Sequence, residues 1–316
     1  MKLSRPSAVV TLDGRGLTPG EARLAWVRLS LGLGAAHDAA ELAAGPGSPL
    51  AAASPGSRLK VALGEAGDEE TVWTGEVSEV AVTSSGLRLE GLAATVALSR
   101  ARRSQTYLRQ SAADIVRDLA ASATLDRIQA PLRFEAYSVD DRRPVWSHVL
   151  DLARLAGCDV SASPEGGLRM APPRHGGAVT LRWGADLLAW RVAAATAPAA
   201  ASTAALGAAS EQGAKRWHWL RHDPVPSPGD TPAYLLGALR TRDAADGASR
   251  ALAVRAGRAA VRGEVLLVGR PALRPGDLVE LRGLPDAAPG PLRVLAVEHR
   301  LDGRAGFVTS LAVEGT

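Results

Sequence analysis

Two histidines, His218 and His222, stand four residues apart, the spacing that places two imidazole ligands on one face of a helix. In a metalloprotease, a helical site of this kind also carries a glutamate between the histidines, and this sequence has none there. Pro224, Pro226 and Pro228 follow at once, and proline removes a backbone donor that a helix needs. We therefore predict an amphipathic strand or loop with tryptophan anchors here, and no metal ligands.

Several acidic residues have the chemistry of a general acid and base. Cleavage of a glycosidic bond needs two carboxylates that face each other across the sugar, and acids that are neighbours in sequence do not establish that geometry. The acids concerned lie beside predicted turns and are Asp140, Asp141, Glu165 and the run Asp68, Glu69, Glu70. We predict that they are solvated loop charges.

The sequence also lacks a complete set of residues for nucleophilic catalysis. His148 and Asp151 lie on a predicted helix, but no Gly-x-Ser-x-Gly sequence supplies a serine on a sharp turn. His299 lies within a predicted strand, where we interpret it as a partly buried or outward-facing polar residue. Cys158 follows a glycine that ends a helix and begins a strand, which favours a buried apolar role over a reactive thiol.

Phosphate-binding glycine motifs are absent from the sequence. Gly32-Leu33-Gly34 lacks the third glycine of a dinucleotide-binding turn, and no Gly-Lys-Ser/Thr loop exists. The sequence thus predicts no catalytic residue, no metal ligand and no cofactor, which favours a structural or binding protein.

The composition is that of a folded protein with two or three domains: 316 residues, 46% hydrophobic and 22% charged. The isoelectric point of 9.7 accompanies a formal net charge of only +4, because arginine titrates so high that a small excess raises it. The arginines are scattered among acids and aromatic residues make up 4%, which argues against a base-stacking surface. A single cysteine fits folding in a reducing compartment.

No apolar signal segment follows Met1, and the charge-free run Val192–Ser210 is mainly alanine interleaved with Ser, Thr, Gly and Pro. Its apolar area per residue is small, so we predict no membrane span.

The pattern of apolar residues predicts strands, then paired helices, then strands again. Strands fill most of the first hundred residues, with a short helix over residues 35–44. Ser111 and Asp114 form a capping-box sequence at the start of one helix, and a second helix runs from Pro144 to Gly157. From residue 178 onward the chain is again mostly β, interrupted by the alanine-rich run and by a helix over residues 243–257.

Three stretches carry a further pattern when taken in order. In residues 102–120, Tyr107 precedes the Ser-x-x-Asp-Ile helix start at Ser111, and residues 146–157 form an aromatic-led helix ending in Leu-Ala-x-x-x-Gly. The third stretch is residues 263–281, with a Pro-Gly-Asp turn, followed by 290–299 and 306–311. Together they resemble the late control D group of phage tail hubs, which is similar to the hub of the T4 baseplate and to the N-terminal region of type VI secretion spike proteins.

The resemblance implies an α+β, mainly β fold with two barrel-like tube modules, 1–110 and 176–316, around an α/β insert with two helices, 111–175. It implies a structural baseplate hub without enzymatic activity, whose homotrimer joins a hexameric inner tube to a trimeric spike beside other baseplate proteins. Two similar modules per chain then give a pseudo-sixfold ring, with a lumen for DNA or cargo. We expect assembly in the cytoplasm and a place in a phage virion or a contractile particle.

Two departures from the group affect these expectations. The chain ends at Thr316, soon after the last predicted strand, so we expect the spike to be a separate protein. The run 192–210 interrupts the second module, either as a mobile loop or as an edge strand at a subunit contact. The sequence assigns no interface or lumen residues. A tail-associated peptidoglycan or glycan hydrolase and a nucleic-acid-binding module are the two alternative functions.

Overall fold

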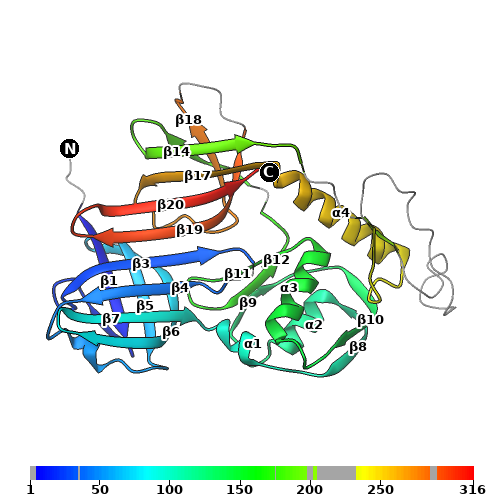
Figure 1. Ribbon diagram of the computed structural model, residues 1–316, viewed down its shortest axis with the longest axis horizontal. Helices are drawn as coiled ribbons and strands as arrows, with labels where there is room; N and C mark the ends of the chain where they lie inside the picture. Colours follow the sequence, from blue (N-terminus) through cyan, green and yellow to red (C-terminus); the bar gives the residue numbers. More distant parts are fainter. Residues whose placement is uncertain (1–4, 35, 175, 198–201, 205–232, 285–289) are drawn as a thin grey trace.

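The computed structural model describes residues 5–34, 36–174, 176–197, 202–204, 233–284 and 290–316 (Figure 1). Most strands belong to one 13-stranded sheet, whose members come from both the beginning and the end of the chain. The few helices come mainly from the middle of the chain, and they lie beside the sheet (Figure 1). The predicted α+β, mainly β class is confirmed.

The first β module consists of seven strands in the order β3-β4-β7-β6-β5-β1-β2. A short 3-10 turn, η1 (Pro49–Ala52), separates β4 from β5. Apolar and polar residues alternate, so that Val27 and Leu29 are buried while Arg28 between them points to the opposite face. The strands are β1 (Pro6–Leu12), β2 (Arg15–Leu17), β3 (Leu24–Gly32), β4 (Ala39–Ala44), β5 (Arg58–Glu65), β6 (Asp68–Thr83) and β7 (Gly86–Ala93).

The helix predicted over residues 35–44 is wrong, because residues 39–44 form the strand β4. Its sequence, Ala-Ala-Glu-Leu-Ala-Ala, favours a helix by intrinsic propensity. Alternate residues of this segment, Ala40, Leu42 and Ala44, are buried in the core, and pairing with β3 and β7 satisfies the backbone on both sides. Tertiary pairing therefore outweighs a local preference of a few tenths of a kcal/mol per residue, roughly.

The middle of the chain forms a separate α/β insert with its own apolar core. The predicted helix ends are confirmed: the Ser111 hydroxyl accepts the Asp114 N–H at 3.2 Å, and Gly157 ends the second helix in the left-handed conformation, with φ 66°. The elements of the insert are α1 (Val96–Arg100), β8 (Gln105–Ser111), α2 (Ala112–Leu119), β9 (Leu125–Ile128), β10 (Arg133–Val139), α3 (Val145–Ala156), β11 (Asp159–Ala162) and β12 (Leu168–Ala171).

The second β module has six strands in the order β14-β17-β20-β19-β18-β13. Before β17 the chain forms the small pair β15 (Ser202–Ala204) and β16 (Ala233–Leu235), then the predicted helix, α4 (Arg242–Arg258). The N-terminal half of α4 packs its alanines into the core of the insert. The strands are β13 (Val179–Arg182), β14 (Leu187–Ala194), β17 (Val261–Val268), β18 (Leu278–Arg282), β19 (Leu292–Asp302) and β20 (Gly306–Glu314).

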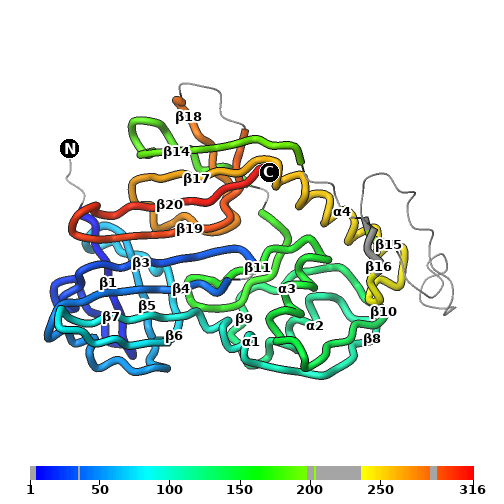
Figure 2. Tube along the Cα trace, in the orientation of Figure 1, coloured from blue at the N-terminus to red at the C-terminus, as the bar shows by residue number. Residues whose placement is uncertain are grey.

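The two β modules repeat one arrangement of six strands (Figure 2). The order β3-β4-β7-β6-β5-β1 matches β14-β17-β20-β19-β18-β13, and the members of each pair of counterparts follow in the same chain order. Bulges coincide: β3 and β14 each carry one next to their first residue pair, and β6 and β19 each carry one at the same point of their pairing with β7 and β20. The repeat is imperfect, since β1 pairs with β5 antiparallel whereas β13 pairs with β18 parallel.

The turn that precedes β5 in the first module has a counterpart before β18 in the second module. Gly56 donates its N–H to the Val77 carbonyl at 2.8 Å, and Gly276 donates to the Val294 carbonyl at 2.8 Å. Both glycines follow a proline, and both have a φ near +90° that favours glycine (93° and 92°). The same turn therefore leads into β5 in one module and into β18 in the other.

Strands β3 and β19 join the two modules into one sheet. They pair antiparallel from Gly32 opposite Ala296 to Trp26 opposite Asp302, so the apolar core is continuous across the junction. His299 lies in the middle of this ladder, fully buried, and its Nδ1 lies 3.0 Å from the Thr309 hydroxyl. Burial, reinforced by the nearby Arg274, lowers the pKa of His299 to about 3, so the imidazole is neutral.

A buried ion cluster fixes the insert against the second module. Arg293 of β19 pairs with Glu314 of β20 at 2.6 Å and with Asp159 of β11. The Arg293 side chain is only 6% exposed. Because a buried carboxylate needs a partner, this arginine holds the β11 hairpin in place.

Replacing Arg293 tests that role. We expect Arg293→Met to keep the apolar stem but remove the paired guanidinium from Asp159 and Glu314, lowering the free energy of unfolding by about 3 kcal/mol. Arg300→Met, on the same strand, removes a half-exposed side chain paired with Asp302 at 2.8 Å, and should change stability by less than about 1 kcal/mol. Urea unfolding measures both, and equal losses would contradict the assignment.

His299 makes stability depend on pH. Its pKa in the folded protein is depressed, so between about pH 3 and 6.5 the unfolded chain binds more protons than the folded one. The free energy of unfolding therefore falls as the pH drops below 6.5, by up to about 1.4 kcal/mol per pH unit from this residue. Asp38, whose pKa burial raises to about 7, contributes in the opposite direction.

We therefore expect the stability difference between the wild type and His299→Gln to become less favourable to the wild type by about 2 kcal/mol from pH 7 to pH 5. The Asp38 contribution is present in both proteins and cancels in this difference. Urea unfolding at the two pH values gives the result. A pH-independent difference would show that the folded protein binds a proton on His299 as readily as the unfolded chain.

Candidate assembly surfaces

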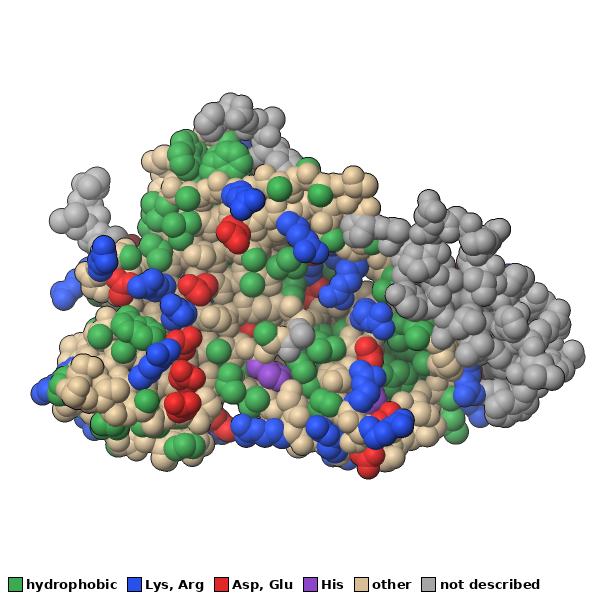
Figure 3. All heavy atoms as spheres, in the orientation of Figure 1, with side chains coloured by type: hydrophobic (Ala, Val, Ile, Leu, Met, Phe, Trp, Pro, Cys, Tyr) green, Lys and Arg blue, Asp and Glu red, His purple; other side chains and the backbone are tan. Residues whose placement is uncertain are grey.

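The face of the sheet away from the apolar core carries a row of ion pairs across β19, β3, β4 and β7. Arg28 lies 3.9 Å from Glu298 and 3.6 Å from Glu41, while Arg88 lies 2.8 Å from Glu41 and 3.7 Å from Glu90. Figure 3 shows acidic and basic side chains gathered over these strands. We call these five residues the charged belt.

The belt follows from strand alternation, because residues on either side of a buried position point to the outer face. Its side chains are between 27% and 50% exposed, so each pair contributes little to stability alone. Arg88 also lies over the Trp26 ring, 5.7 Å from its centroid. In the second module Arg191 stands opposite Glu264, as Arg28 stands opposite Glu41. The outer face is therefore polar and of mixed sign.

The continuous sheet has two open edges among the residues that the structure describes. Apart from a bridge between Leu187 and Trp183, β14 pairs only with β17, and from Glu79 to Thr83 β6 pairs only with β7. These two edges lie at the top and bottom of the row of strands in Figure 1. Exposed apolar side chains accompany them: Val82 of β6 is 78% exposed and Leu188 of β14 is 49% exposed. Open edges with apolar side chains are places where another chain can pair.

The structure does not assemble the predicted catalytic candidates into one site. His148 is buried, with Nε2 3.1 Å from the Asp140 carbonyl, whereas Asp151 pairs with Arg143 at 2.7 Å. Asp140 pairs with Arg142 at 3.1 Å, and this contact lowers the pKa of that carboxyl. Each group is thus engaged in an ordinary structural contact.

The remaining acids are surface residues. Asp141 and Glu165 are exposed on separate elements, and the run 68–70 opens β6 at the hairpin with β5. His218 and His222 lie outside the described residues. Within the described ranges, no group of three or more His, Cys, Asp or Glu residues has a metal-binding arrangement, and no helix has the length and apolarity of a membrane span.

Cys158, Gly32 and Gly34 all make contacts that stabilise the fold. The Cys158 thiol is buried, and burial raises its pKa to about 12. Gly32 ends β3 and donates its N–H to Asp38 at 2.9 Å, while Gly34 donates to the Val160 carbonyl. These contacts place residues 32–34 at the joint between the first module and the insert.

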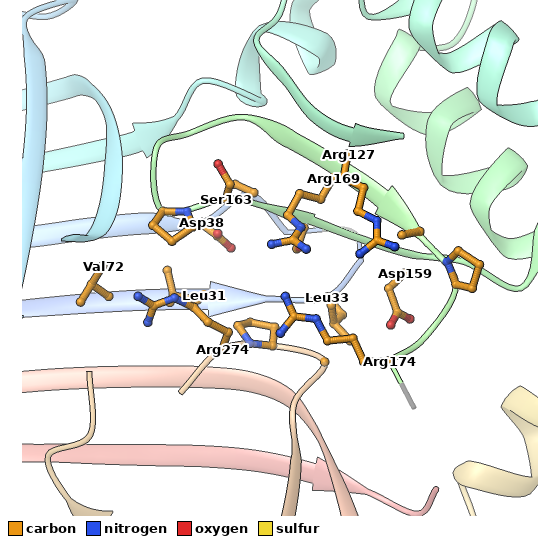
Figure 4. Close-up of a pocket in the computed structure, with 17 residues that line it drawn as sticks. Leu31, Leu33, Asp38, Val72, Arg127, Asp159, Ser163, Arg169, Arg174 and Arg274 are labelled. Atoms are coloured by element: carbon orange, nitrogen blue, oxygen red, sulfur yellow. The ribbon is translucent and has the colours of Figure 1, made fainter. Parts of the chain in front are cut away.

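A cleft of about 60 Å³ opens where both modules and the insert meet (Figure 4). Arg274 donates to the Thr71 carbonyl of β6 at 3.1 Å, and Arg174 pairs with Asp277 at 2.9 Å. Two further arginines, Arg127 and Arg169, line the opposite wall (Figure 4). Arg274 and Arg174 therefore connect separate segments of the chain. The cleft volume of about 60 Å³ is too small for most ligands.

Sequence reasoning did not find the belt or the open edge of β6, and for the edge at β14 it offered only the alternative that the run 192–210 forms an edge strand. The belt has a local signal in the sequence, since Arg28 and Glu41 each stand between two apolar residues of a strand and therefore point outward. An open edge has none, because it depends on which strands lack a partner in the completed sheet.

Comparison with solved structures shows the same overall arrangement in other proteins. The chain matches the tail protein of Neisseria meningitidis MC58 with a TM-score of 0.72 at 14% identity, covering 98% of this chain and 96% of that one. The 43 kDa tail protein of prophage MuSo2 from Shewanella oneidensis gives 0.68 at 14% identity, covering 98% of each chain.

An E. coli component of the type VI secretion system, described as similar to the T4 tail proteins gp27 and gp5, gives a TM-score of 0.65 at 9% identity. The match covers 97% of this chain and 76% of that one. No protein-family model and no curated protein matches the chain. At these identities the likeness shows the fold alone: the chain has the fold of phage tail proteins and of a type VI secretion component, and the resemblance predicted from its sequence is confirmed at that level.

Proposed function

We propose that this protein is the structural baseplate hub of a contractile tail-like particle, either a phage tail or an injection system. Three copies form a ring that joins a hexameric inner tube to a trimeric spike, and the spike is a separate protein. The observation that carries the proposal is the duplicated β module, joined edge to edge with its copy through β3 and β19.

The duplication gives a physical route from threefold to sixfold symmetry. A trimer of a chain with two equivalent modules presents six similar modules around one axis. A cyclic assembly needs a heterologous contact, in which one surface meets a different surface of the next copy. The two open edges differ, one along β14 and the other along residues 79–83 of β6, which is the polarity that such a ring requires.

The charged belt suits the wall of a channel. A channel wall with only positive side chains would bind a nucleic acid through its phosphates. Here Arg28 and Arg88 alternate with Glu41, Glu90 and Glu298, so positive charge is balanced locally. We infer that this face lines the lumen and that DNA or protein cargo passes without strong attachment.

The predicted division into modules 1–110 and 176–316 around the insert 111–175 belongs to the same proposal, although α1 and β8 pack into the core of the insert. The modules form the ring, and the insert stands outside it, where the inner tube protein, the spike and other baseplate proteins have different surfaces to contact. Assembly takes place in the cytoplasm, and the finished hub is part of the virion or particle. It acts without catalysis, and the separate placement of His148, Asp151 and Glu165 supports that statement.

The mass in solution tests the ring. One chain has a mass of 32.7 kDa, so we expect 3 × 32.7 = 98.1 kDa by light scattering or native mass spectrometry. Electron microscopy of the same sample should show a ring with an open centre. As a control for the hydrolase alternative, zymography on peptidoglycan should show no clearing. A chain that stays monomeric even with its particle's tube and spike proteins present would sink the hub proposal.

A further inference from the structure

A groove of about 520 Å³ lies between the helices α3 and α4 and is also lined by β11 and by residues of β19 and β20. It is on the insert side of the molecule, beside the sheet and away from both open edges (Figure 1). Its volume falls within the range of about 300–1,000 Å³ that is typical of binding sites for organic groups. We call it the α3–α4 groove.

The groove carries apolar side chains that the fold leaves partly uncovered. Leu33, Leu150 and Leu295 line it from three different parts of the chain, and each is only partly buried. Val254 of α4 is 52% exposed, and the small side chain of Ala251, three residues earlier, leaves room beside it. An apolar group that entered the groove would remove these surfaces from water, which is favourable.

Three arginines of α4 surround this apolar surface. Arg250, Arg255 and Arg258 line the groove, and none of them forms an ion pair within the part of the chain that the structure describes. The buried Nε of Arg258 has no hydrogen-bond partner there either. Burial, together with the nearby Arg293, lowers the pKa of Arg258, so its positive charge is unfavourably placed. Figure 3 shows basic side chains gathered between the sheet and the helices.

The acids of the groove do not compensate for these arginines. Asp151 pairs with Arg143 at 2.7 Å, while Asp159 and Glu314 are both paired with Arg293. Five arginines and three acids line the groove in all, so positive charge is in excess. An anionic group from outside would therefore meet guanidinium groups that lack a partner.

The dipole of α4 accounts for only part of this arrangement. Arg255 and Arg258 lie in the last turn of the helix, where a positive side chain is favourable. Arg250 lies more than two turns before the end, beyond the reach of that effect. Nor does the dipole explain why the arginines enclose the exposed Val254. Unpaired cations around an apolar surface are the complement of a segment that is both acidic and apolar.

We propose that the α3–α4 groove is a docking site for an acidic segment of another protein. An apolar side chain of that segment packs against Leu150, Val254 and Leu295, and its carboxylates pair with Arg250 and Arg255. A single-stranded nucleic acid would find no aromatic side chain for base stacking among the described residues that line the groove. The site uses neither open edge of the sheet, so the inference goes beyond the proposed ring and does not depend on it.

A labelled peptide tests the chemistry of the groove in the full chain. The probe is a fluorescein-labelled peptide of twelve residues, in which pairs of glutamate alternate with pairs of leucine, and fluorescence anisotropy measures its binding. One control peptide has lysine in place of every glutamate, and another has serine in place of every leucine. We expect a Kd below about 100 μM for the probe and at least about tenfold weaker binding of each control. A probe that does not bind at about 1 mM would overturn the proposal.

Variants with a matched control locate the binding. Arg250→Gln with Arg255→Gln should weaken probe binding by about tenfold or more, and so should Val254→Asp, which puts a carboxylate on the apolar surface. Arg103→Gln with Arg304→Gln removes the same charge from exposed positions elsewhere and should change the Kd by less than about twofold. Unchanged unfolding midpoints show that the variants are folded. Equal weakening by the two double variants would mean attraction by net charge alone and would overturn the site.

Competition identifies the class of ligand. Sodium phosphate should displace the probe no better than sodium chloride of the same ionic strength, and a twelve-nucleotide oligo-dT should displace it at least about tenfold less well than the unlabelled peptide. Displacement by phosphate would indicate a site for a free anion, and displacement by oligo-dT would indicate a nucleic-acid site. Either result contradicts a protein segment as the occupant.

Thiol labelling gives a readout of position. The variant Val254→Cys places an exposed thiol in the groove, whereas the native Cys158, which also lines it, is buried and has a raised pKa. Saturating probe should slow maleimide labelling of the introduced thiol by about tenfold, and unchanged labelling would place the peptide elsewhere. A chain that binds the probe in this way but never forms a ring would overturn the hub and keep the groove.

Discussion

The structure depends on one constraint, that the backbone groups along a strand edge must find partners. The β3–β19 ladder meets it inside the chain, and in doing so it makes one sheet and one apolar core from two modules. His299 shows how completely that junction is closed, since an imidazole kept neutral by burial lies in the middle of the ladder. Without this pairing, each module would expose an edge and an apolar row, and the charged belt would be cut between Arg28 and Glu298.

The insert is held by one ion cluster and by apolar packing of α4, and not by the main sheet. Arg293 reaches from β19 to Asp159 of the β11 hairpin, and the N-terminal half of α4 packs into the core of the insert although it precedes β17 in the chain. A buried ion pair contributes little net stability but is specific, because misplacing either partner leaves a charge unpaired. The junction therefore determines how the modules associate, and the cluster determines where the insert stands relative to them.

Local signals predicted local features. The capping residues at Ser111 and the glycine stop at Gly157 are properties of short segments, and the structure confirms them. β4 was mistaken for a helix because its alanines carry no β preference, and only its partners make it a strand. The duplication was expected only from the family resemblance, because the two modules share few residues; the two Pro-Gly turns and the paired Arg28–Glu41 and Arg191–Glu264 are traces of it. Register and open edges arise from long-range pairing, which a single sequence does not display.

The edge strand β3, which is paired inside the chain, and its counterpart β14, which is open, differ in composition. β3 buries Val27, Leu29 and Leu31, whereas β14 carries Trp190, Val192 and Ala194 at the same positions. A junction formed during folding gains from large apolar residues, but the same residues on an open edge would promote aggregation before assembly. Alanine and an outward Arg191 reduce that risk.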